Sequence, residues 1–237
     1  MQAKPYVREI SIRDDAQFDE EDYPFTIPAV RHMDTICPHA DVTFFVGENG
    51  AGKSTILEAI AVAMGLPSEG GSRHVHREQQ QVSPLHQHLK IVKGFRKPNF
   101  SYFLRAESLF NVFTYIDDIG TAKPSLHLRS HGEAFMDVML DFGPRGLYLL
   151  DEPEAALSPS RQLAALSAIH QLVQQECQFI IATHSPILLS YPNAKILQFD
   201  ATGITEVAYE DTEHYAITHD FLNHYERRLE QLLTDDE

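Results

Sequence analysis

The chain has few cysteines and no long apolar run. Cys37 and Cys177 are the two cysteines among 237 residues. They lie far apart in the sequence and form none of the close pairs typical of zinc sites, so we expect reduced structural thiols. No segment approaches the roughly 18 consecutive apolar residues that a membrane-spanning helix needs. The sequence therefore excludes a cysteine-based metal site and predicts no contact with a membrane.

Basic residues are also scarce, with 19 Lys and Arg against 34 Asp and Glu and a net charge of −15. A general nucleic-acid binder needs a basic surface, so this charge argues against that class. It leaves room for a local basic groove, and the densest basic stretch, residues 73–97, is the candidate. A solvated face is at least as good an explanation of that stretch. Nucleic acid is thus an open partner that the net charge does not indicate.

The N-terminal segment MQAKPYVREI lacks the apolar core of a signal peptide, which predicts a cytoplasmic protein. The hydrophobic content of 43% is enough to build a packed core. A chain of this length suits one α/β domain, so we expect residues 1–237 to form a single domain. Residues 67–99 are polar and rich in histidine, and we interpret them as an insertion in that domain.

What the chain does contain is a glycine-rich segment, GENGAGKST, at residues 47–55. It fits the pattern G-x-x-x-x-G-K-[ST], in which backbone N–H groups surround phosphate oxygens. Lys53 would reach the β- and γ-phosphates of a nucleotide, and the hydroxyl of Ser54 would ligate Mg²⁺. The predicted phosphate-binding residues are Gly47, Glu48, Asn49, Gly50, Ala51, Gly52, Lys53, Ser54 and Thr55.

Both flanks of this segment support the interpretation. Residues 41–46 (DVTFFV) form a short apolar run, as a buried parallel strand should. Residues 54–64 carry apolar side chains on one stripe, which predicts a helix that ends at Gly65. Phosphates would then lie at the helix N-terminus, where the helix dipole favours anions. A chance glycine-rich turn would not have both flanks.

Two carboxylates follow the apolar strand predicted at residues 146–150. Successive side chains of a strand point to opposite sides, so Asp151 can hold Mg²⁺ while Glu152 faces the γ-phosphate. A carboxylate in that place can orient and deprotonate the attacking water. Acidic pairs at strand ends are usually solvated, and here the phosphate loop upstream favours the catalytic interpretation.

A third apolar strand is predicted at residues 178–182 and is followed by Thr183 and His184. A histidine at that edge can hydrogen-bond the γ-phosphate or the attacking water. A lone histidine after a strand is more often structural. Here the phosphate loop and the two carboxylates favour a functional role for His184. The predicted catalytic residues are therefore Glu152, His184 and Lys53.

The remaining pattern predicts an α/β fold with a largely parallel sheet flanked by helices. Further strands are expected at residues 6–13, 25–30, 89–92 and 100–104, with a hairpin from 194–199 and 204–209. Helices are expected at residues 108–119, 133–142, 159–175 and 213–233, with a loop at 120–128. The last helix has an apolar stripe that would pack on the domain or, alternatively, dock on a partner.

Together these motifs resemble the ABC-type ATPases, and more closely the soluble branch with SMC-like, RecF-like and overcoming-lysogenization-defect-type ATPases. The resemblance covers residues 42–199 and implies a P-loop NTPase fold of ABC-ATPase type with an N-terminal antiparallel β portion. In that branch the strand carboxylates are followed by E-x-x-L, which residues 154–157 match. Residues 154–160 would form the D-loop, with Ser158 in place of the Asp usual in transporter subunits.

The signature loop departs from the transporter form L-S-G-G-Q. This chain has SHGE at residues 130–133, in which Ser130 and Gly132 match while His131 and Glu133 do not. That form resembles a family of small AAA/ABC-type ATPases. Aligning the chain on the transporter Q-loop places Arg105 where Gln is usual. We expect Arg105 or Glu107 at that position, with Gln87 as a rival.

The resemblance implies a site completed by two chains. One chain supplies Lys53, Ser54, Asp151, Glu152 and His184, and the other supplies Ser130 and Gly132 at a helix N-terminus. The expected function is Mg²⁺-dependent ATP hydrolysis at a head-to-tail homodimer interface, driving ATP-gated dimerisation. By family analogy alone the setting would be DNA repair or antiphage defence.

Two alternatives stay open. One is a nucleotide-gated regulatory or scaffold module that controls a separate effector protein, since the chain has no recognisable nuclease or protease domain. The other is the nucleotide-binding subunit of a transporter, which the signature loop disfavours.

Smaller features are ambiguous. Tyr23 and Phe25 are spaced to stack on adenine, although core packing is the commoner role of an aromatic residue. Two H-x-H pairs, at residues 74–76 and 86–88, would share a face if they lay on strands, and a metal site there is the less favoured interpretation.

Overall fold

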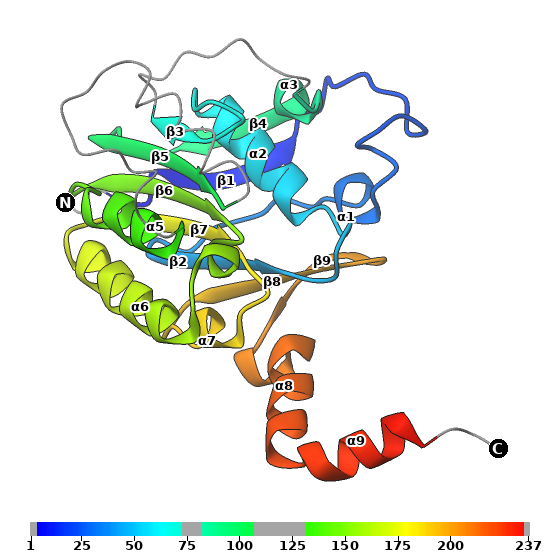
Figure 1. Ribbon diagram of the computed structural model, residues 1–237. Coiled ribbons are helices and arrows are strands. Elements are labelled where there is room, and N and C mark those ends of the chain that lie inside the picture. The colour runs from blue at the N-terminus through cyan, green and yellow to red at the C-terminus, as the bar shows by residue number, and fades with distance from the viewer. Residues whose placement is uncertain (1–3, 73–81, 107–130, 235–237) are drawn as a thin grey trace.

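The computed structural model describes residues 4–72, 82–106 and 131–234 (Figure 1). The strands in these residues are β1 Val7–Ile12, β2 Val42–Val46, β3 Gly71–Ser72, β4 Leu89–Lys93, β5 Phe100–Arg105, β6 Gly146–Asp151, β7 Gln178–Ala182, β8 Lys195–Asp200 and β9 Gly203–Val207. The helices are α1 Pro28–Arg31, α2 Lys53–Ala63, α3 Leu85–His88, α5 His131–Leu140, α6 Pro159–Gln174, α7 Pro186–Leu189, α8 Glu213–Asn223 and α9 Tyr225–Leu233. Two 3₁₀ turns are η2 Pro153–Ala156 and η3 Tyr209–Asp211.

One sheet has the strand order β3-β5-β6-β7-β2-β8-β9, and β1 pairs with β4 in a second sheet. Strands β5, β6, β7, β2 and β8 run parallel, whereas β3 and β9 are antiparallel to their neighbours. The pair β1–β4 is antiparallel as well. The predicted fold class, a largely parallel sheet flanked by helices with an N-terminal antiparallel portion, is confirmed.

The central strands are buried on both faces. Every residue of β2, β6 and β7 is buried, as expected where helices cover both sides of a parallel sheet. Leu147 and Leu149 of β6 pack in the core under α2, while Tyr148 and Leu150 pack in the core under α5 and α6. Figure 1 shows α2 on one side of the sheet and α5 and α6 on the other. The two apolar faces of β6 therefore hold the two layers together.

Residues 67–99 take part in the packing where the structure describes them. The strand expected at residues 89–92 is present as β4, and it pairs with β1. Leu85 and Leu89 are buried in the same core as α2. His86 and His88 lie on the short helix α3 rather than on a strand, so their side chains do not share the face that the metal hypothesis required.

Two predicted elements are wrong. Residues 25–30 do not form a strand, because the chain turns into the short helix α1 with Pro28 in its first turn. Proline suits that position, since its missing N–H would be unpaired there in any case. The helix predicted at residues 213–233 is broken at His224 into α8 and α9. Asn223 and His224 are both weak helix formers, which makes this the natural point for the bend.

The helix and loop predicted at residues 108–119 and 120–128 lie outside the described residues. Within the described part of the chain, no helix combines the length and apolarity needed to cross a membrane.

A buried amide joins the N-terminal segment to the sheet. Oε1 of Gln178, at the start of β7, accepts hydrogen bonds from the backbone N–H groups of Tyr6 at 2.8 Å and Val7 at 2.9 Å. Its Nε2 donates to the backbone oxygens of Val7 and His39, both at 3.0 Å. The side chain is completely buried. Its amide makes hydrogen bonds to the backbone of Tyr6 and Val7 of the kind that a neighbouring strand would make, and so it links the two sheets.

Replacing Gln178 with Leu is expected to destabilise the protein by about 2–5 kcal/mol, because two buried N–H groups lose their acceptor. Urea unfolding followed by circular dichroism measures the difference. Gln174→Leu on the exposed surface of α6 is the matched control and should change little. A loss below about 1 kcal/mol would mean that the backbone groups find other partners.

Candidate functional site

Three parallel strands bring the sequence motifs to one edge of the sheet. Strand β2 ends at the glycine-rich loop, β6 ends at Asp151, and β7 ends just before Thr183 and His184. The strands are adjacent in the order β6-β7-β2. In register, Ala182 at the end of β7 lies between Asp151 of β6 and Phe45 of β2. The carboxyl ends of these strands therefore gather side chains that are far apart in the sequence.

The glycine-rich loop has a backbone that only glycine adopts readily. Gly47 has φ 138°, and a Cβ at this position would lie 2.3 Å from the carbonyl oxygen of Phe199. Gly52 has φ 100°, and a Cβ there would lie 2.9 Å from Cγ2 of Ile27. These two residues fix the path by which the loop leaves β2 and enters α2. The N-terminus of α2 consequently points into the loop, as the sequence predicts.

Lys53 is buried at the start of α2, and its ammonium group bridges the loop. The Nζ atom donates to the carbonyl oxygens of Gly47 at 2.8 Å and Glu48 at 2.9 Å. Burial lowers the pKa of Lys53, while the nearby carboxylates of Glu152 and Asp151 act to raise it. The ammonium is thus held by neutral carbonyl groups, from which it can turn toward a phosphate oxygen.

Ser54 and Asp151 form a pair of oxygen donors. The hydroxyl of Ser54 donates to Oδ1 of Asp151 at 2.8 Å, and the Asp151 side chain is buried. In the described parts of the chain, no cluster of three or more His, Cys, Asp or Glu side chains could hold a metal unaided. Mg²⁺ commonly uses few protein ligands and completes its shell with water and substrate phosphates. The donor pair therefore fits Mg²⁺ held jointly with a nucleotide.

Arg105 lies beside this pair and forms ion pairs with two carboxylates. Its NH1 atom is 2.9 Å from Oε2 of Glu58, and its Nε atom is 3.4 Å from Oδ2 of Asp151. The parallel register of β5 and β6 places Arg105 opposite Asp151. A guanidinium has no lone pair to offer a metal, so Arg105 cannot act as a metal ligand.

Of the two other Q-loop candidates, the structure describes one. Gln87 is exposed on α3, and Glu107 lies outside the described residues. A direct contact between Arg105 and a nucleotide stays a prediction.

Glu152 follows β6 in a left-handed conformation, with φ 48° and ψ 52°. This conformation is uncommon for a residue other than glycine and often occurs at functional sites. Its N–H donates to the carbonyl of Ala182 at 2.9 Å, which ties the turn to β7. Oε1 of Glu152 lies 3.6 Å from Nε2 of His184. The two predicted catalytic side chains therefore face each other.

Glu154, in the expected D-loop, ties that loop to the segment after β7. Its carboxylate accepts a hydrogen bond from the Thr183 hydroxyl at 2.7 Å and another from the backbone N–H of His184. Burial raises the pKa of Glu154, and these hydrogen bonds act in the opposite direction. The link between Glu154 and His184 joins residues 30 positions apart, so no local pattern predicts it.

His184 has a second neighbour, which lies on a helix 30 positions further along the chain. Nδ1 of His184 lies 2.9 Å from Nε2 of His214 on α8. Among the described residues, Nε2 of His184 has no hydrogen-bond partner, although it is buried. No local pattern marks His214, because only the fold of the C-terminal segment brings it to the site.

The structure separates the two candidates for stacking on adenine. Tyr23 is 61% exposed, and its hydroxyl lies 3.2 Å from Oγ1 of Thr55 in the glycine-rich segment. Phe25 is buried and stacks on Phe18 with 3.8 Å between ring centroids. Phe25 is therefore a core residue, and Tyr23 alone of the two is accessible next to the loop.

Of the predicted signature loop, Ser130 lies outside the described residues. Gly132 lies in α5, which the structure describes from His131 to Leu140. Glu133 pairs with Arg161 of α6 at 3.4 Å.

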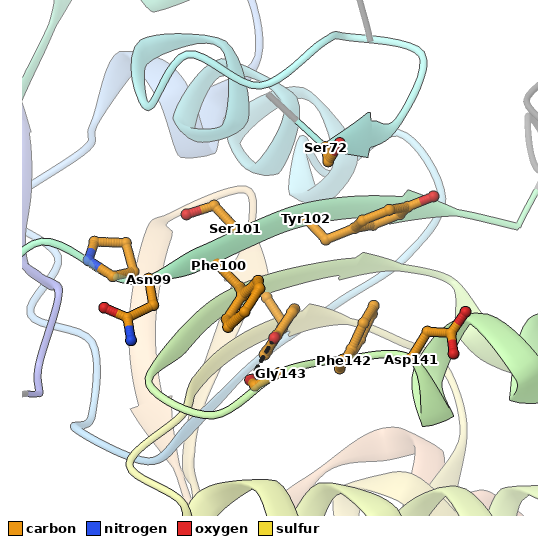
Figure 2. A pocket seen from close by; sticks show the side chains of 10 residues that line it. Ser72, Asn99, Phe100, Ser101, Tyr102, Asp141, Phe142 and Gly143 are labelled. Carbon is orange, nitrogen blue, oxygen red and sulfur yellow. Dashed lines mark hydrogen bonds between the residues drawn. The ribbon is translucent and has the colours of Figure 1, made fainter. Parts of the chain in front are cut away.

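One cavity lies at the glycine-rich loop, and another lies away from the predicted site residues. One of about 420 Å³ borders the glycine-rich loop and is lined by Gly47, Glu48, Asn49 and His214 among others. Another of about 350 Å³ lies beside β5, where Phe100, Tyr102 and Phe142 line it (Figure 2). The hydroxyl of Tyr148 donates to the carbonyl of Gly143 at 2.6 Å in that second cavity. The cavity beside β5 is lined by none of the predicted site residues. The cavity at the glycine-rich loop borders the motifs, and so does another of about 510 Å³ lined by Glu48, Asn49, His184 and His214 among others.

A protein-family model for an AAA domain matches residues 10–101. The phosphonates import ATP-binding protein PhnC 2 of Albidiferax ferrireducens is 27% identical over 196 residues, covering 68% of this chain and 69% of that protein. The translation initiation factor RLI1 of Saccharomyces cerevisiae is 26% identical over 169 residues. That match covers 68% of this chain but only 27% of the yeast protein.

Solved structures give further likenesses. An SMC head domain from Thermotoga maritima aligns with a TM-score of 0.47 at 15% identity, covering 86% of this chain and 100% of that one. The protein cbiO1 from Clostridium perfringens, part of the ABC transporter complex cbiONQ, aligns with a TM-score of 0.44 at 14% identity. That alignment covers 85% of this chain and 91% of cbiO1.

Proposed function

We propose that the chain is a small P-loop protein of the ABC/AAA type that binds ATP with Mg²⁺ and hydrolyses it between two copies of itself, in line with the AAA-domain match and the likeness to an ATP-binding protein. The observation that carries this proposal is the meeting of five side chains at one edge of the sheet. They are Lys53, Ser54, Asp151, Glu152 and His184. Each has the chemistry that its position in a nucleotide site requires.

The phosphates of ATP would lie in the glycine-rich loop at the N-terminus of α2, where backbone N–H groups and the helix dipole favour anions. Lys53 would exchange its contacts with the carbonyls of Gly47 and Glu48 for contacts with phosphate oxygens. Ser54 and Asp151 would hold Mg²⁺, which neutralises charge on the phosphates when bound. Tyr23 is the candidate for the adenine contact.

Glu152 is the proposed general base. Its carboxylate would accept a proton from the attacking water, and His184 would hold the other side of the reacting centre through its Nε2 atom. The distance of 3.6 Å between them leaves both groups available to a ligand rather than fully engaged with each other. The side chain of Glu152 is 35% exposed, so a second chain could reach it, whereas the Nε2 atom of His184 is buried within this chain.

In the proposed dimer, the second copy contributes the signature loop at the start of its α5. Ser130 and Gly132 would meet the γ-phosphate, so ATP would join the two copies and hydrolysis would release them. A role of this cycle in DNA repair or antiphage defence, with DNA or an effector protein as partner, is supported by family resemblance alone.

The test measures phosphate release and molecular mass in solution on the same sample. With ATP and Mg²⁺ we expect slow turnover and a dimer. Chelating Mg²⁺ with EDTA should reduce turnover to the buffer background, because the Ser54–Asp151 pair cannot organise the phosphates without the cation. Turnover that persists unchanged in EDTA would contradict the proposed site. Stimulation by added DNA would support a DNA-linked role.

A transporter subunit is the second candidate, and the match to a phosphonate-import ATP-binding protein over 69% of that protein's length favours it. Co-purification with a membrane permease would support this candidate. A dimer active without any membrane protein would favour the first.

A further inference from the structure

Helix α8 is attached beside the site by its first turn. Thr212, which precedes the helix and is buried, accepts a hydrogen bond from the N–H of Tyr215 at 3.3 Å and donates to the carbonyl of Tyr209 at 2.7 Å. The hydroxyl of Tyr209 in turn donates to the carbonyl of Pro186 at 2.8 Å. Pro186 opens α7, two residues after His184. The start of α8 is therefore fixed to the segment that carries His184.

This attachment brings two imidazole rings into contact. Nδ1 of His184 and Nε2 of His214 are 2.9 Å apart, with ring centroids separated by 5.0 Å. Burial lowers the pKa of both histidines, which favours neutral rings. Between two neutral imidazoles, a hydrogen bond of this length requires one nitrogen to carry a proton and the other to be bare.

The surroundings of His184 determine which nitrogen carries the proton. Its Nε2 atom lies 3.6 Å from Oε1 of Glu152 and is otherwise without a partner in the described residues. A bare Nε2 would turn its lone pair toward a carboxylate oxygen, and two acceptors repel each other. A protonated Nε2 presents N–H to the carboxylate instead. Nδ1 of His184 must then be bare, and Nε2 of His214 must be the donor.

We propose that His214 is a positioning residue, whose Nε2–H donates to Nδ1 of His184 and so holds His184 in the tautomer that presents Nε2–H to Glu152 and the γ-phosphate. The inference rests on the proposed ATPase function and adds to it a residue from the C-terminal segment. It follows the general rule that a functional histidine is oriented through the hydrogen bond made by its other ring nitrogen.

Two substitutions separate a hydrogen-bonding role from a packing role. His214→Phe keeps a ring in the space but removes the donor. His214→Gln keeps an N–H donor, because its amide nitrogen is as many bonds from Cβ as Nε2 of histidine. His219→Phe, at an exposed position on the same helix, is the matched control.

The direct measurement is nitrogen-15 NMR of the histidine rings at about pH 8, well above the ordinary histidine pKa. The His184 signals are identified by their loss in His184→Gln. In the wild type and in His214→Gln, we expect His184 to be protonated at Nε2 and bare at Nδ1. In His214→Phe, we expect a mixture of tautomers. A wild-type His184 protonated at Nδ1, or a single unchanged tautomer in His214→Phe, would overturn the proposal.

Kinetics supply the second measurement. In His214→Phe, kcat is expected to fall about tenfold or more, as is usual when the partner of a functional histidine is removed. The KM for ATP should change less than kcat, because the glycine-rich loop itself is unaltered, although His214 lines the cavity beside it. His214→Gln should recover most of kcat, and an equal loss in both variants would reduce His214 to a packing role. If the wild type has no turnover at all, the proposed function fails, while the NMR result still decides the histidine pair.

Discussion

Replacing Glu152 with Gln is expected to stop ATP turnover while ATP binding continues. The amide has the size of the carboxylate, but it cannot take a proton from water, so kcat should fall by roughly 10² to 10⁴. The substitution leaves the hydrogen bonds of Lys53 to the loop carbonyls in place and removes one of the negative charges near its ammonium. Because hydrolysis is what would separate the two copies, the variant should accumulate as an ATP-bound dimer.

Phosphate release and light scattering on the same sample measure both effects. Glu206→Gln makes the same chemical change on the edge strand β9, where the side chain is 62% exposed and paired with Lys195, and it should behave as wild type. A Glu152→Gln protein that hydrolyses ATP at the wild-type rate would show that Glu152 is not the base. A variant that stays monomeric with ATP would instead count against ATP-gated dimerisation.

Replacing Lys53 with Ala is expected to abolish ATP binding. Lys53 is buried, and its ammonium lies near the carboxylates of Asp151, Glu152 and Glu154 as well as the loop carbonyls. Its loss would leave these carboxylates without that cation and the phosphates without their lysine contact. Removing one partner of a buried charge pair commonly costs 2–5 kcal/mol, which corresponds to an increase in Kd of about 30-fold to several thousand-fold.

Titration calorimetry with ATP and Mg²⁺ measures that increase. Lys90→Ala, at an exposed position of β4, is the control and should bind ATP normally. A melting curve for Lys53→Ala distinguishes lost binding from lost folding. Unchanged affinity in a folded Lys53→Ala protein would contradict the assignment of the glycine-rich loop as the phosphate site.

Local patterns predicted much of the fold and of the candidate site. The strands β2, β6 and β7 are short apolar runs, and each is followed directly by residues of the candidate site. The apolar run predicts where the strand ends, and the motif predicts functional residues at that same position. Parallel strands of one sheet expose their carboxyl ends on one edge, which is why separate motifs could be expected to meet.

The features that were missed depend on contacts between distant parts of the chain. His214 reaches His184 only because α8 is attached beside α7, and the pairing of Arg105 with Asp151 follows from the register of β5 on β6. The turn at Pro28 and the break at His224 are local, but they compete with apolar patterns that continue past them. In both cases the apolar pattern alone predicted one uninterrupted element, a strand at residues 25–30 and a helix at residues 213–233.

The amide of Gln178 also constrains the order of folding. Its hydrogen bonds to Tyr6 and Val7 join residues that are 172 and 171 positions apart, and the Tyr6 hydroxyl bonds the carbonyl of Glu176 across 170 positions. Contacts across such separations close large loops and form slowly compared with local ones. Pulse-labelling hydrogen exchange during refolding would report late protection of the Tyr6 and Val7 amides. Strand β1 must therefore wait until Gln178 has been synthesised before its native contacts are complete.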